Sequence, residues 1–107
     1  MSVTTFPEVE EQQEVKHKIL PPYNVILLND DDHTVDYVVG MMQKLFGHPR
    51  EKGLKIAEEV HTKKRCIVFT CTKELAELKQ EQIHGFGPDK AIPKCKGSMS
   101  ARIEPAN

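Results

Sequence analysis

One apolar run constrains the fold more than any other feature of the sequence. Residues 23–28 read Tyr-Asn-Val-Ile-Leu-Leu, directly after Pro21-Pro22. The run stops at Asn29-Asp30-Asp31-Asp32, whose side chains favour turns because they bond to nearby backbone. A nearly continuous apolar strand needs cover on both of its faces. We therefore expect residues 23–28 to form the central strand of a sheet.

Three later stretches follow the helical period of 3.6 residues. The first covers residues 35–46, with Thr34 as its N-cap and Gly47 just past its end. The second has Pro49 at its first position, and the third is capped by Thr72. The residues expected to face inward are Leu54, Ala57 and His61 on the second helix, and Leu75, Leu78, Gln82, Ile83 and Phe86 on the third.

Two more strands complete the expected fold. Residues 65–71 are β-branched and aromatic, and in residues 99–104 apolar and polar side chains alternate. Residues 87–98 are rich in Gly, Pro and Lys and predict a loop. The order β-α-α-β-α-β predicts an α+β domain of two layers, in which a three-stranded antiparallel sheet packs against three helices.

The 107 residues have room for one domain, which we place at residues 23–107. Residues 1–22 are acidic and poor in large apolar side chains, so we expect a flexible extension there. We expect a cytoplasmic monomer, because no export signal is visible and no apolar run approaches the ~20 residues of a membrane helix. The net charge of −1 lacks the basic surplus of a nucleic-acid binder. The thiols expected to be free are Cys66, Cys71 and Cys95.

The acidic turn is the first candidate site. Turn chemistry explains any one of Asn29, Asp30, Asp31 and Asp32, but adjacent carboxylates repel one another and favour a bound cation. Calcium loops alternate their acidic ligands with other residues, and this run does not. A charged amine is the other option, because an ammonium group donates three hydrogen bonds that Asn and Asp oxygens accept.

His61 is the second candidate, and two interpretations stay open. It is either a hydrogen-bonded core histidine near a helix end or a polar group on the rim of an apolar pocket. We expect the other four histidines on the surface. No catalytic motif and no metal-ligand spacing is present, so we expect neither an enzyme nor a bound cofactor or metal. The surface histidines are His17, His33, His48 and His84.

Several of these residues together resemble the ClpS family. The resemblance lies in a strand and turn over residues 23–31, an acidic–aromatic–valine segment at 36–39, and Val60-His61. The stretches 68–70, 76–79 and 99–104 are also similar, so it covers about residues 21–104. The family consists of adaptors that recognise destabilising, bulky hydrophobic N-terminal residues. They deliver such substrates to a ClpA- or ClpC-type AAA+ unfoldase coupled to the ClpP peptidase.

The resemblance also implies roles for individual residues. Asn29, Asp30 and His61 correspond to the residues that bind the substrate's α-amino group, and Asp31 adds negative potential. Val38 and Met99 correspond to the apolar wall beside that group. Glu74 and Lys79 correspond to residues that contact the N-terminal domain of the unfoldase. The implied partners are thus this unfoldase and substrates with a destabilising N-terminus.

The sequence departs from the family pattern in two places that bear on the pocket. His33-Thr34-Val35 replaces the usual Thr-Pro-Met, and Ala57 stands where a larger residue is common. We expect Val35 and Ala57 to enlarge the pocket unless Met41, Met42 or Met99 fills the gap. The loop at residues 87–98 is also longer than is common in the family.

Two alternatives remain open. A ribosome-associated or other interaction domain can share this fold without binding amines, because fold alone does not fix function. A small metal-dependent enzyme could use the aspartates and histidines. The acidic turn together with His61 favours the adaptor over the first alternative, since such a domain needs no amine site.

Overall fold

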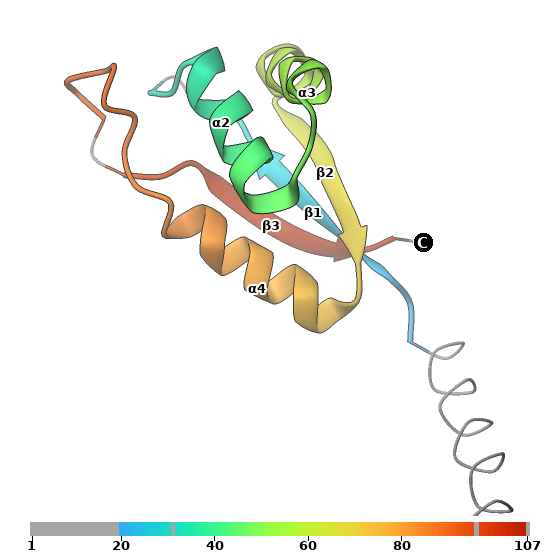
Figure 1. Ribbon diagram of the computed structural model, residues 1–107. Helices are drawn as coiled ribbons and strands as arrows, with labels where there is room; N and C mark the ends of the chain where they lie inside the picture. The colour runs from blue at the N-terminus through green and yellow to red at the C-terminus, as the bar shows by residue number, and fades with distance from the viewer. Residues whose placement is uncertain (1–19, 31, 96, 107) are drawn as a thin grey trace, which may run out of the picture.

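The computed structural model describes residues 20–30, 32–95 and 97–106, so most of the expected extension lies outside it. The elements follow the predicted order, but the last strand begins and ends one residue later than predicted. Figure 1 shows the two layers. The elements are β1 (Tyr23–Leu28), α2 (Val35–Phe46), α3 (Arg50–Lys63), β2 (Arg65–Cys71), α4 (Lys73–His84) and β3 (Ser100–Pro105).

The sheet is antiparallel and has the strand order β2-β1-β3, so the prediction of a central β1 is confirmed. Val25, Ile26 and Leu27 have no exposed surface. The register with β2 changes between Val25, which pairs with Phe69, and Ile26, which pairs with Ile67. Val68 is therefore the extra residue of a β-bulge, and its carbonyl is bonded by the His48 ring at 2.7 Å.

The three helices cover one face of the sheet and bury a single core against it (Figure 1). β1 contributes Val25 and Leu27 to this core, and Met41 and Met42 of α2 are fully buried beside them. The predicted α+β architecture of two layers is confirmed. In the described part of the chain, no helix has both the length and the apolar character needed to cross a membrane.

The helix ends follow the local sequence. Thr34 caps α2 by accepting a hydrogen bond from the Tyr37 N–H, and Gly47 ends the helix in the left-handed conformation with φ 67°. Thr72 caps α4 in the same way as Thr34 caps α2. Pro49 lies at the N-cap of α3 and not at its first helical position.

The predicted inner face of α3 is wrong for two of its three residues. Leu54 is 39% exposed and His61 is also exposed, while Ala57 is buried as expected. The helix instead turns Gly53 toward α2, where an added Cβ would lie 3.2 Å from the Val39 Cα. This close approach fixes the rotation of α3, and its buried face is Gly53, Ile56, Ala57 and Val60.

The predicted inner face of α4 is also partly wrong. Leu75 and Leu78 are exposed, and Ala76 and Ile83 are the buried residues. Two polar side chains explain the rotation, because both bond to the Ala101 backbone of β3: the Gln80 amide donates to its carbonyl at 2.9 Å, and the His84 ring accepts from its N–H at 3.1 Å. These bonds hold the side of α4 that carries Gln80 and His84 against the sheet.

Cys66, Cys71 and Cys95 are free thiols, as expected. Burial, followed by the neighbouring Glu59, raises the pKa of Cys66 to about 12. The folded protein at pH 8 should therefore hold on the order of 10³ times less Cys66 thiolate than the unfolded chain. We expect a short iodoacetamide pulse to label Cys66 only when guanidinium is present, as read by mass spectrometry of its peptide. Equal labelling with and without guanidinium would contradict the burial of this thiol.

Candidate functional site

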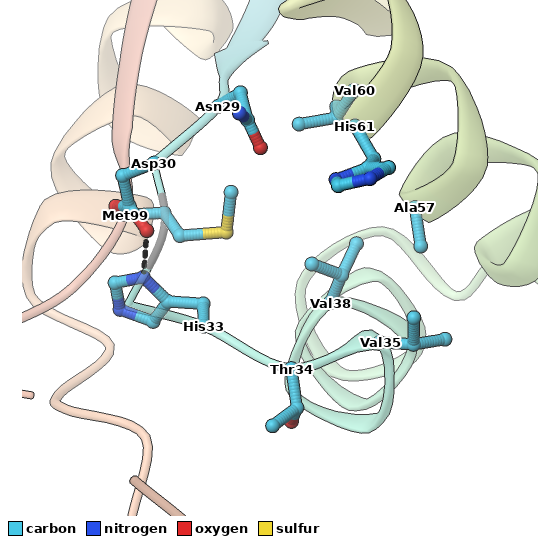
Figure 2. A pocket seen from close by; sticks show the side chains of 10 residues that line it. All are labelled: Asn29, Asp30, His33, Thr34, Val35, Val38, Ala57, Val60, His61 and Met99. Carbon is cyan, nitrogen blue, oxygen red and sulfur yellow. Dashed lines mark hydrogen bonds and ion pairs between the residues drawn. The ribbon is translucent and has the colours of Figure 1, made fainter.

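A pocket of about 450 Å³ opens at the end of the sheet where β1 leads into the acidic turn. Four separate parts of the chain form it: the segment after β1, the start of α2, the second half of α3, and the residue before β3 (Figure 2). The lining residues are Asn29, Asp30, His33, Thr34, Val35, Val38, Ala57, Val60, His61 and Met99.

Seven of these residues were singled out from the sequence, and the structure brings them together around this one pocket. They are Asn29, Asp30, Val35, Val38, Ala57, His61 and Met99. Asp31, the remaining residue of the predicted amine site, lies outside the described residues. Sequence analysis missed three lining residues: His33, Thr34 and Val60.

The ends of β1 and α3 are joined by the backbone. The Asn29 N–H donates to the carbonyl of Lys64 at 3.0 Å. Lys64 terminates α3 in the left-handed conformation, with φ 71°. His61 lies three residues before this C-cap, so the same bond holds the last turn of α3 beside the residue that follows β1. Asn29 and His61, two of the predicted amine ligands, are therefore held near each other by this bond between the ends of β1 and α3.

The pocket has an apolar floor and a polar rim. Val38, Ala57, Val60 and Met99 are each at most 5% exposed, while Val35 is 52% exposed and stands at the mouth. In Figure 2 the side chains of Asn29, Val38, His61 and Met99 point toward the same hollow. His61 is thus an exposed pocket residue, and its position fits the rim interpretation. The Thr34 side chain points away from the hollow, in keeping with its role as the cap of α2.

The acidic turn folds around Asp30. Its Oδ1 accepts the N–H of Asp32 at 2.9 Å and lies 2.5 Å from Nδ1 of His33. The expectation that His33 lies on the surface is wrong, because its side chain is only 3% exposed. The reason lies far away in the sequence: Nε2 of His33 is 2.8 Å from the carbonyl of Gly97, in the segment that closes over the ring.

Residues 87–98 form no helix or strand among their described positions, as predicted, but they are anchored to the pocket. The buried carboxylate of Asp89 accepts the N–H groups of Thr34, at 2.7 Å, and Ala91, at 2.9 Å. Burial by itself would raise the pKa of Asp89, but these two N–H groups lower it overall. The Tyr37 hydroxyl adds a second anchor by donating to the carbonyl of Gly87.

Glu74 and Lys79, the residues expected to meet an unfoldase, lie on α4 and do not line the pocket. Glu74 is exposed in the first turn of the helix. Lys79 is half-buried and does not lie on an open polar face. Its ammonium donates to the carbonyl of Leu45 at 2.6 Å and lies 5.4 Å from the centre of the Phe46 ring.

Among the residues that the structure describes, no three His, Cys, Asp or Glu side chains are grouped so that they could hold a metal ion. The pocket itself offers hydrogen-bond acceptors of the acidic turn and of His61 next to an apolar cavity. Such a site binds a ligand that carries a hydrogen-bond donor at one end and an apolar group at the other.

Fold and site together define a small α+β binding domain with its ligand pocket at one end of the sheet. The profile of a family described as "ATP-dependent Clp protease adaptor protein ClpS" matches residues 18–93. The ATP-dependent Clp protease adapter protein ClpS of Aromatoleum aromaticum is 34% identical over 83 residues, which are 78% of this chain and 81% of that protein. The chain belongs to the ClpS family, whose members are adaptors of the Clp protease.

A solved structure shows the same fold. Agrobacterium tumefaciens ClpS2 bound to L-phenylalaninamide superposes with a TM-score of 0.68 at 24% sequence identity. The match covers 79% of this chain and 96% of that one. The shared fold therefore extends over nearly the whole of the Agrobacterium protein.

Proposed function

We propose that this chain binds proteins by a free N-terminal residue with a large apolar side chain and delivers them to a ClpA- or ClpC-type AAA+ unfoldase for degradation by ClpP. One observation carries the proposal: the acceptors Asn29, Asp30 and His61 lie on the same pocket as the apolar floor. An N-terminal residue is the part of a protein that presents an ammonium group and a side chain from a single carbon.

The chemistry of the two halves is complementary to such a residue. An α-ammonium group has three N–H donors, and the pocket offers the Asn29 amide oxygen, the Asp30 carboxylate and a ring nitrogen of neutral His61. The side chain then enters the space bounded by Val38 and Met99. An internal residue has one amide N–H and no charge at this position, so it leaves acceptors unpaired.

The comparisons support this assignment. The ligand in the solved Agrobacterium relative, L-phenylalaninamide, combines a free α-amine with an aromatic side chain. Both groups match the two halves of the pocket in this chain. An interaction domain without an amine site has no need for an apolar cavity beside acidic acceptors.

A binding screen tests the proposal. Fluorescence anisotropy is measured with peptides that differ only in the first residue, with and without an acetylated amine. We expect Phe-, Tyr-, Trp- and Leu-initiated peptides with a free amine to bind, and Ala-, Glu- and Lys-initiated peptides to bind far more weakly. An affinity that is the same for all first residues would favour an interaction domain of another kind and overturn the proposal.

Delivery requires a second surface, which we place on α4 at Glu74. We expect Glu74→Lys to weaken binding to an unfoldase N-terminal domain by about 5-fold, since a charged rim contact contributes about 1 kcal/mol. Peptide affinity should not change, because Glu74 does not line the pocket. Surface plasmon resonance with immobilised unfoldase domain measures the first effect.

Glu51→Lys is the matched control, because Glu51 is also an exposed acid in the first turn of a helix. Both reversals lose the same favourable interaction with the helix dipole. Equal losses of unfoldase binding in the two variants would contradict a specific surface at Glu74. Lys79 is a poor test, because its replacement also removes the bond to the Leu45 carbonyl.

A further inference from the structure

His33 occupies a place in the pocket that the resemblance does not explain, because the usual residue there is threonine. Its imidazole is almost completely buried, with 3% of the side chain exposed. One ring nitrogen faces the Asp30 carboxylate, and the other faces the anchored segment at residues 87–98. Tyr37 packs on the ring with a centroid distance of 4.5 Å. The ring is thus contacted on three sides.

We propose that His33 is a positioning residue for the amine site, and this inference rests on the proposed function. Both bonds that the described residues make to the Asp30 carboxylate fall on Oδ1, one from His33 and one from the Asp32 N–H. Oδ2 takes part in neither of these two bonds. His33 itself bonds to Asp30 and acts on the ligand through that carboxylate.

The far side of the ring is held by the segment at residues 87–98. Nε2 lies 2.8 Å from the Gly97 carbonyl and 3.3 Å from the Cys95 thiol, and that thiol donates to the same carbonyl at 3.2 Å. These contacts fix the ring in the orientation that presents Nδ1 to Asp30.

The bond from His33 fixes which way the Asp30 carboxylate points. Without the ring, the carboxylate loses one of its two bonds within the described part of the chain and can rotate, so peptide affinity should fall.

Two variants separate the two sides of the ring. His33→Asn keeps a donor near the position of Nδ1, and His33→Gln keeps one near the position of Nε2. At about pH 7.5 we expect His33→Asn to bind a Phe-initiated peptide within about 2-fold of wild type. We expect His33→Gln to lose about 5- to 10-fold, because Asp30 is no longer held.

Retention of affinity in His33→Asn, together with its loss in His33→Gln, separates positioning of Asp30 from a purely structural role. Thermal unfolding followed by circular dichroism shows that each variant is folded.

Equal losses of affinity in His33→Asn and His33→Gln would overturn the inference. If His33→Gln does not fold, the affinity of folded His33→Asn decides alone, and a loss well beyond about 2-fold overturns the inference. Failure of the proposed function looks different, because wild type itself would then bind acetylated and free peptides alike.

Discussion

Acetylation of the α-amine of a Phe-initiated peptide is expected to lower its affinity for this protein by about 30- to 150-fold. The change removes the charge and two of the three donors of the ammonium group. Asn29, Asp30 and His61 then keep acceptors without partners in a partly desolvated pocket. The expected cost is about 2–3 kcal/mol, because the bound peptide covers these acceptors and leaves them without partners.

Asp30→Ala should weaken binding of the free peptide by a similar order, because it removes the carboxylate at the amine position. Asp32→Ala is the matched control, since Asp32 is an exposed carboxylate of the same turn that does not line the pocket. We expect this control to change the affinity by less than about 3-fold. Isothermal titration calorimetry measures all three proteins with both peptides. Equal binding of acetylated and free peptides by wild type would remove the basis for an amine site.

The sequence was sufficient to predict those parts of the fold that depend on residues close together along the chain. The run at residues 23–28, the cap at Thr34 and the left-handed Gly47 each depend on local backbone preferences, and the structure has all three as predicted. The rotations of α3 and α4 about their own axes were not predictable in this way. They depend on a close approach of Gly53 to Val39 and on polar bonds to Ala101, which no period of apolar residues encodes.

The same distinction applies to the candidate site. Asn29, Asp30 and His61 were found because they stand at motif positions, and their grouping follows from the bond between Asn29 and Lys64. His33 was missed because its burial depends on Gly97, which is 64 residues away. The signal that could have found it was the departure itself, since a histidine next to three aspartates replaces the family's threonine.

The two other departures, Val35 and Ala57, are not equivalent in the structure, and this difference sharpens the expected specificity. Ala57 is 5% exposed on the pocket floor, whereas Val35 is 52% exposed at the mouth. Met41 and Met42 are fully buried in the core and do not line the pocket, so of the three methionines considered, Met99 alone can reach into it. Space at Ala57 should therefore favour Phe, Tyr or Trp over Leu as the first residue.

Ala57→Met adds three heavy atoms to this floor and should lower affinity for Phe- and Trp-initiated peptides by about 1–3 kcal/mol, the usual cost of overpacking. Leu-initiated peptides should lose less, so the ranking reverses. Val35→Met is the matched control: it places the same flexible side chain at the mouth, where the chain can turn into solvent, and the ranking should stay as in wild type. Anisotropy titrations of three peptides against three proteins measure this. If wild type prefers Leu, or if both variants shift the ranking equally, Ala57 does not set the depth of the pocket.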